Sequence, residues 1–277
     1  MLLQSIHMQF KVIFEKKSAL TILFLLMGII LINYFTNVVT YKGTDVIAMY
    51  HPMKLLTLSS FSEYSFYILQ YFPLIVVMPA GFSLFTDKQG NQYIFIQSRV
   101  GAHRYYWGKL IVVFLVTFFI FTVPFLLEIL LSTIAFPMMA TGDPSNLSTY
   151  DASYMNTVNM YLLSDLYIYS PYIYAIFFTL IFGLFSGILA VFTVSISTFS
   201  IKYKVLLFLP VYLLLYFLGM LKQLFPTMSV ETNYFFYLAF YHPLQNASNS
   251  LFFFILFALI LLFLSILIVV LKIRKDT

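Results

Sequence analysis

The sequence contains no cysteine, and charged residues occupy only 9% of its 277 positions. The absence of cysteine excludes disulfides, thiolate metal sites and cysteine nucleophiles. Soluble domains carry roughly a quarter of their residues as charged side chains, so no soluble catalytic domain fits this chain. Hydrophobic residues make up 62% of it. The composition predicts an all-α, polytopic membrane protein.

Common catalytic and nucleotide-binding motifs are also missing. Gly101 to Lys109 superficially suggests a phosphate loop, but six residues separate Gly101 from Gly108 rather than four, and Leu110 stands where Ser or Thr would hold magnesium. There is no H-E-x-x-H motif and no cluster of metal ligands. We therefore expect this chain itself to bind no cofactor and no metal. Its net charge of +5 follows the membrane topology, so no nucleic-acid partner is expected.

Apolar runs of about 20 residues predict six transmembrane helices in a single transmembrane domain, residues 1–277. The predicted spans are residues 18–39, 64–85, 108–135, 171–199, 205–221 and 251–271. Pro73 and Pro79 lie in the second span and predict kinks or unwound turns there. Gly183 and Gly187 form a G-x-x-x-G pattern in the fourth span, which favours close helix packing.

Two further segments are apolar but do not span. Residues 1–17 place Leu3, Ile6, Phe10, Ile13 and Phe14 on one helical face. Such a pattern predicts an amphipathic helix in the membrane interface. The run 234–241 is too short to cross a bilayer, and we interpret it as a re-entrant or interfacial piece.

The distribution of basic residues predicts the orientation. With both termini in the cytoplasm, 12 of the 15 Lys and Arg residues lie inside, as the positive-inside rule requires. The inside set is Lys11, Lys16, Lys17, Lys88, Arg99, Arg104, Lys109, Lys202, Lys204, Lys272, Arg274 and Lys275. Lys42, Lys54 and Lys222 are then the basic residues outside.

The central cytoplasmic loop, residues 86–107, is the longest polar interruption on that side. Gly90-Asn91 is a turn signal, Gln92 to Arg99 can form about two helical turns, and Gly101 can end that helix. A short helix held between two spans can transmit force from a soluble partner. The alternative is a basic loop that merely obeys the positive-inside rule.

Glu128 is the ionisable residue deepest in an apolar run. A charged side chain at the bilayer centre costs about 2.5 to 3.5 kcal/mol on insertion scales. We therefore expect it to face other helices or a wet cavity, or to be protonated. It is either a cavity or gate residue or a hydrogen-bonded packing residue. Two histidines recur as Tyr50-His51-Pro52 and Tyr241-His242-Pro243, which is either a paired site or a coincidence.

The central loop resembles that of the permease subunits of type II ABC exporters. The pattern is an acid, a glycine, a short apolar-polar helix, basic residues and then Gly-Lys at the start of the next span. Here these positions are Asp87, Gly90, Ile94 to Gln97, Arg99, Arg104 and Gly108-Lys109. The family usually has Glu at the position of Asp87 and often has proline near Ser98. The resemblance extends loosely over the six predicted spans and the N-terminal helix.

The resemblance implies a coupling helix that docks on a separate ATPase subunit, which binds ATP and magnesium. Its coupling residues would be Asp87, Gly90, Asn91, Ile94, Phe95, Gln97 and Arg99. Two permeases, identical or homologous, and two ATPases would export a hydrophobic or amphipathic peptide, drug or lipid across a bacterial plasma membrane. The alternatives are a non-transporting immunity or sensor protein and a membrane-embedded lipid-modifying enzyme.

Overall fold

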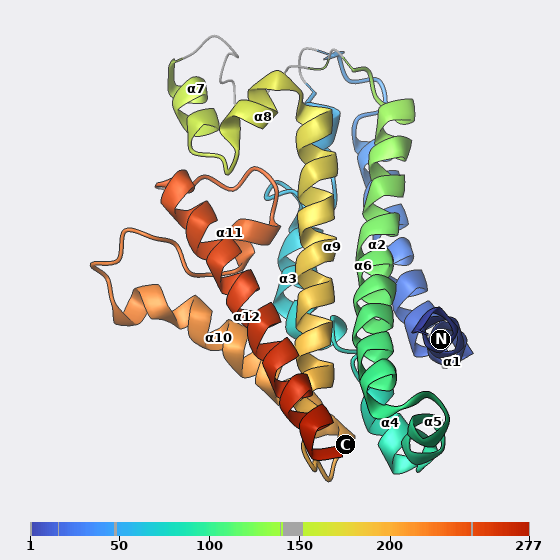
Figure 1. Cartoon of the computed structure of the whole chain (residues 1–277). Coiled ribbons are helices and arrows are strands. Elements are labelled where there is room, and N and C mark those ends of the chain that lie inside the picture. The colour runs from blue at the N-terminus through green and yellow to red at the C-terminus, as the bar shows by residue number, and fades with distance from the viewer. Residues whose placement is uncertain are drawn as a thin grey trace.

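The structure is a computed structural model of the whole chain. It describes residues 2–15, 17–46, 49–138, 140, 152–244 and 246–276. Within these residues every regular element is a helix, and β-pairing is limited to two isolated bridges, Ser59 with Phe240 and Tyr161 with Pro243. The all-α prediction is confirmed. Three long helices, α2, α6 and α9, run along one another, whereas α10 and α12 are tilted away from them and α1 lies across the bundle (Figure 1).

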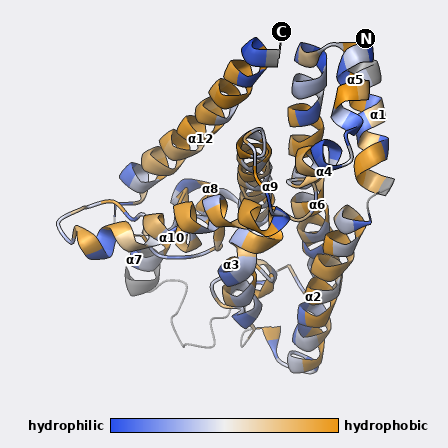
Figure 2. Cartoon of the chain, turned by 90° about the horizontal axis from the view of Figure 1, so that it is seen from below, coloured by the Kyte–Doolittle hydropathy of each residue, from blue (hydrophilic) through white to orange (hydrophobic). Residues whose placement is uncertain are grey.

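In the described part of the chain, five helices are long and apolar enough to cross a membrane. They are α2 (Ser18–Thr40), α6 (Ala102–Ala135), α9 (Pro171–Ile196), the helix Lys204–Leu224, which joins η3 (Lys204–Leu207) to α10 (Phe208–Leu224), and α12 (Ala247–Asp276). Figure 2 shows hydrophobic residues along these helices and hydrophilic ones gathered in the short helices and at the chain ends. These features are compatible with a multi-pass membrane protein.

The predicted second span, residues 64–85, is not one continuous helix. The helix α3 (Glu63–Ile75) has 13 residues, a length of about 20 Å at 1.5 Å per residue, which is too short to cross a bilayer core. Turns follow, and α4 (Ser83–Gln89) resumes the helix. Pro73 and Pro79 lack the N–H that would continue the helical ladder, and the unwound turns predicted for this stretch are present. Residues 64–85 are therefore not among the five helices that are long and apolar enough to cross a membrane.

The helices α6 and α9 form the centre of the bundle. Phe72 of α3, Phe121 and Phe125 of α6, and Phe182 and Phe185 of α9 are all buried there. Most of their rings meet edge to face or tilted, for example Phe125 and Phe182 with centroids 5.4 Å apart, and Phe72 stacks on Phe185 at 6.3 Å. Such aromatic pairs contribute about 0.5 to 1.5 kcal/mol beyond the area they bury. The core therefore fixes α3, α6 and α9 relative to one another.

Gly183 and Gly187 lie where α9 touches α6. A Cβ added at Gly183 would collide with Thr122 and crowd Phe118, and one added at Gly187 would meet the Phe114 ring 2.7 Å away. The glycine pair thus allows the two backbones to approach closely within one chain.

We expect Gly183→Ala to destabilise the protein by about 1 to 3 kcal/mol, because the new methyl group overpacks the contact with α6. Gly28→Ala is the matched control, since Gly28 is also inside a long helix and its added Cβ would meet nothing within 4 Å. Thermal melting in detergent measures both. Equal melting temperatures for the two variants would contradict the assigned contact.

The helix α1 (Leu2–Glu15) packs across the start of α6 rather than lying free of the bundle. Ser5 and Gln9 are buried, and Gln9 Nε2 donates to the Tyr105 carbonyl oxygen at 3.0 Å. Gly108 makes room for this contact, because a Cβ there would lie 2.8 Å from Ser5 Oγ. The buried face carries Ser5, Gln9 and Ile13, while Phe14, expected on the apolar face, is exposed. The hydrogen bonds from Ser5 and Gln9 to α6 therefore determine which face of α1 packs against the bundle.

The segments predicted to be cytoplasmic gather at one end of the bundle. The helices α1, α4 and α5 (Gln92–Val100) lie there together with the C-terminal end of α12 (Figure 1). The opposite end carries α7 (Ala152–Asn159) and α8 (Ser164–Tyr169). A tyrosine cluster of Tyr161, Tyr167, Tyr174 and Tyr241 joins α8, α9 and the segment before α12, with ring centroids 5.2 to 5.8 Å apart.

Candidate functional site

The short helix predicted in the central loop is present as α5. It begins after Asn91, whose φ of 54° is left-handed, and it ends at Gly101, whose φ is 85°. Asparagine and glycine are the residues that adopt this conformation at least cost. The preceding Gly90 closes α4, and its N–H donates to the Thr86 carbonyl oxygen at 3.0 Å. The local sequence therefore encodes both boundaries of α5.

The helix α5 packs Tyr93 and Ile96 partly against the core and leaves much of the rest of its surface exposed. It has no buried residue, and Phe95 and Ile94 are 69% and 50% exposed. Arg99 in its last turn is exposed as well. Large apolar side chains next to an arginine are typical of the anchor residues of protein interfaces.

A cleft of about 940 Å³ separates α5 from the end of α12. Tyr93, Ile94 and Gln97 of α5 form one wall, and Ile268 and Lys272 of α12 form the other. The cleft is completed by Lys88, Asn91, Thr198, Phe199, Ser200, Leu271 and Lys275. Asn91, Ile94 and Gln97 therefore face this cleft, whereas Asp87 is absent from its lining.

Asp87 is buried and anchors the loop to α6. Its Oδ2 lies 2.7 Å from Lys109 Nζ, with each side chain 1% exposed, and it accepts a hydrogen bond from Tyr105 Oη at 2.9 Å. Lys88 donates to the carbonyl oxygens of Ser197 and Thr198 at 2.9 and 2.6 Å, which adds a cation to the C-terminal end of α9. Asp87 thus positions the loop instead of lying on its exposed surface.

We expect Asp87→Leu to destabilise the protein by about 3 to 5 kcal/mol, because it leaves the Lys109 ammonium buried without its counter-ion. The double variant Asp87→Leu/Lys109→Met removes both charges and is expected to recover most of that loss. Melting temperature and limited proteolysis of the loop measure the effect. A double variant no more stable than Asp87→Leu would contradict the importance of this ion pair.

Glu128 lies between helices, at the centre of a hydrogen-bond network. Its Oε1 accepts bonds from Asn33 Nδ2 at 3.0 Å, from the Thr57 N–H at 2.8 Å and from Thr57 Oγ1 at 2.6 Å. All three side chains are buried. Asn33 also donates to the Leu55 carbonyl oxygen at 3.0 Å. The network ties α6 to α2 and to the segment that follows η2 (Pro52–Leu55), and it favours the packing interpretation of Glu128.

We expect Glu128→Leu to destabilise the protein by several kcal/mol, because the Thr57 N–H and Asn33 amide lose their buried acceptor at about 1 to 3 kcal/mol each. Glu128→Gln keeps an acceptor oxygen and is expected to cost less. Melting temperature separates the two variants. A Glu128→Leu protein that melts like the wild type but fails in transport would instead support a cavity or gate role.

The two recurring histidines are not brought together. His51 Nδ1 accepts the Met53 N–H at 3.2 Å and its ring packs on Tyr172, whereas the His242 ring packs on Phe236. Burial, and then the nearby Lys54 charge, lower the pKa of His51 from 6.5 to about 4. Within the described ranges, no group of three or more His, Cys, Asp or Glu side chains could hold a metal ion.

Sequence reasoning missed an ion pair between Lys222 and Glu231, which both lie in the stretch predicted to be an external loop. Lys222 Nζ lies 2.7 Å from Glu231 Oε2. A short separation of opposite charges was the available signal, but hydropathy assigned both residues to solvent.

Comparisons with protein-family models, curated proteins and solved structures give no match to this chain.

Proposed function

We propose that this chain is the membrane-spanning permease subunit of an ATP-driven exporter of the type II ABC class. The observation that supports this best is α5, an exposed apolar helix with defined ends, anchored through Asp87 to a long apolar helix. A separate ATPase subunit, which binds ATP and magnesium, docks on α5. The working unit contains two permeases and two ATPases in a bacterial plasma membrane, with the α5 end in the cytoplasm.

The contacts around α5 provide a route for force. A displacement of α5 moves α4, which is tied to α6 through the buried Asp87–Lys109 pair. The same part of α6 carries α1 through the bonds of Ser5 and Gln9. Because α6 packs on α9 along the glycine pair, the motion reaches the centre of the bundle. The exported cargo is hydrophobic or amphipathic, in keeping with aromatic residues at 20% of the chain.

We expect Phe95→Ala and Arg99→Glu each to abolish docking of the ATPase while the permease stays inserted. A two-turn helix offers a partner few anchors, and loss of one hot-spot anchor costs about 2 kcal/mol or more. The measurement is co-purification of an ATPase with the tagged chain, together with ATP-dependent export by the complex.

Phe24→Ala is the matched control, because Phe24 is 70% exposed, close to the 69% of Phe95, but lies on the span α2. It is expected to retain the ATPase. If the wild-type chain brings down no ATPase, or if all three variants retain it and export normally, the proposed function is wrong. A ligand-bound chain without an ATPase would favour the sensor alternative.

A further inference from the structure

The segment between α10 and α12 folds back into the bundle instead of staying at the outer end. It contains α11 (Phe235–Leu238), beside which the Tyr234 hydroxyl donates to the Leu69 carbonyl oxygen of α3 at 2.9 Å. The Tyr237 ring stacks on Phe254, which packs in turn on Phe185 in the middle of α9. The segment therefore reaches the middle of the span α9, as the re-entrant interpretation predicts.

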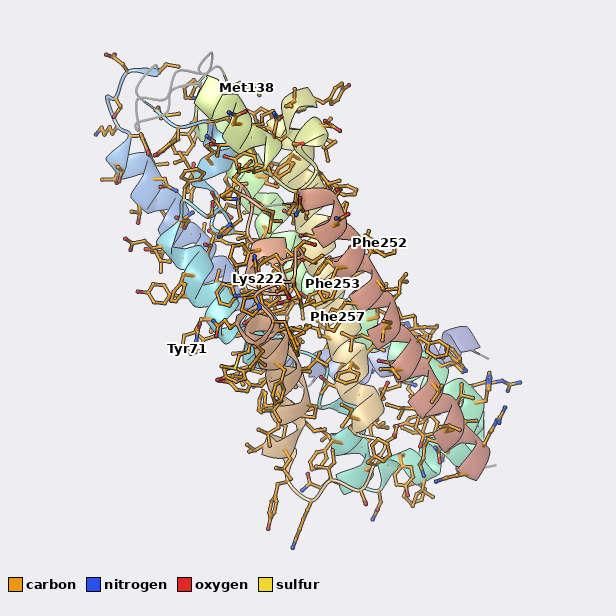
Figure 3. The ribbon with its side chains drawn as sticks, turned by 90° about the vertical axis from the view of Figure 1, so that its left-hand side faces the viewer. Tyr71, Met138, Lys222, Phe252, Phe253 and Phe257 are labelled. Carbon is orange, nitrogen blue, oxygen red and sulfur yellow. The ribbon has the colours of Figure 1, made fainter. Side chains whose placement is uncertain are left out.

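The Lys222–Glu231 pair lies at the same depth. The Tyr237 hydroxyl donates to the Glu231 carbonyl oxygen, and the Glu231 N–H donates to Ser250 Oγ at 3.3 Å. Figure 3 shows Lys222 about halfway along the molecule, on the side that also carries Phe252, Phe253 and Phe257. A charged pair is thus held halfway between the two ends of the bundle.

This pair is organised and open on one side. Glu231 is 10% exposed, and its Oε1 accepts the N–H groups of Thr232 and Asn233 at 3.1 and 3.2 Å. Lys222 is 39% exposed. An ammonium group has three donors, and the bond to Glu231 uses one of them. The fixed carboxylate holds Lys222 in place while part of its ammonium remains accessible.

Polar side chains also line a cavity of about 260 Å³, and two of its lining residues are neighbours of the pair: Gln223 follows Lys222 in the chain, and the Asn233 N–H donates to Glu231 Oε1. Lys222 and Glu231 are themselves not among the residues that line this cavity. Gln70 of α3, Gln223 of α10 and Asn233 line it, together with Tyr212 and Tyr216. The chain between α10 and α11 is irregular here, and residues 225–227 and 229 are exposed.

Lipid cannot cover such a surface. Irregular backbone at membrane depth occurs only where it is buried in protein or lines a water-filled cavity. Ionisable residues within the membrane likewise face helices or water. The pair, the amides and the irregular backbone are exposed in the single chain, and a hydrated site would meet this requirement for all three together.

We propose that Lys222, Glu231 and the amides of Gln70, Gln223 and Asn233 form a water-filled polar site at mid-membrane depth that takes the head group of a zwitterionic amphiphile. The ammonium and the carboxylate match its two charges, and Phe252, which is 69% exposed on α12 on the same side of the molecule as Lys222, suits an apolar tail. This inference rests on the proposed function, because a second copy of the chain is what closes the site against lipid.

Because the chain has no cysteine, single cysteines report directly on hydration. Gln223→Cys and Ser229→Cys probe the site, Phe119→Cys is the lipid-facing control in the middle of α6, and Met138→Cys is the control at the outer end. Permeabilised cells are treated with a cationic methanethiosulfonate, which needs water and an ionised thiol. Unreacted thiols are then counted after denaturation.

We expect Gln223→Cys and Ser229→Cys to react within about tenfold of the rate at Met138→Cys, and Phe119→Cys to react at least about a hundredfold more slowly. Two site cysteines as slow as Phe119→Cys would overturn the proposal. The labelling needs no ATPase, so a failure here is distinct from failure of the proposed function, which appears as absent ATPase co-purification.

The ligand class is tested with lysophosphatidylcholine as the probe. It is expected to slow labelling at Gln223→Cys several-fold and to leave Met138→Cys unchanged. Adding Lys222→Met and Glu231→Gln to Gln223→Cys removes both charges together, so that neither is left without its counter-ion. In this triple variant, lysophosphatidylcholine is expected no longer to slow the labelling. Absence of protection in Gln223→Cys, or equal protection after both charges are removed, would overturn the assignment of the head-group site.

Discussion

The constraint on which this structure depends is that polar groups inside an apolar bundle must find partners within the protein. Glu128 accepts three hydrogen bonds from two segments distant in sequence, and Asp87 is matched by Lys109 and Tyr105. These contacts join parts of the chain that apolar packing alone would leave free to slide. Aliphatic and aromatic side chains supply most of the core, and the buried polar groups help to decide which helices meet and in which register.

The helix α6 contributes residues to both groups of polar contacts, the one around Asp87 and the one around Glu128, so it links the two ends of the bundle. Lys109 holds α4 near one end, while Glu128, about 28 Å further along at 1.5 Å per residue, holds the segment after η2. Under the proposed function, a push on α4 and α5 would be passed to α6, which is one helix with Pro124 inside it. Its close contact with α9 at Gly183 and Gly187 carries that movement into the centre of the bundle.

Sequence reasoning was sufficient where the signal is local. Hydropathy predicts α2, α6, α9, α10 and α12 with small differences at their ends, and Asn91 and Gly101 bound α5 as their conformational preferences require. Sequence reasoning failed where the structure depends on contacts between residues far apart in the chain. The partners of Glu128 lie 71 and 95 residues away in the chain, and the length of α3 depends on where proline interrupts the ladder. Charge alone could not tell that Asp87 is buried while Arg99 is exposed, because the two residues are equally polar in sequence.

The surroundings of two lysines add to the distribution of Lys and Arg between the two ends of the bundle. The sequence count of basic residues placed three of them outside, and the structure gives two of these three side chains a contact partner. Lys54 is buried and lies over the Phe61 ring at 5.1 Å, and Lys222 is paired with Glu231 at mid-depth, which leaves Lys42 exposed at that end. At the opposite end, Lys11, Lys17, Arg99, Arg104, Lys202, Lys204, Arg274 and Lys275 are exposed. The positive-inside rule counts the basic residues of short loops in the sequence, so these contacts leave the predicted orientation as it was, and they show instead that the fold gives Lys54 and Lys222 structural partners.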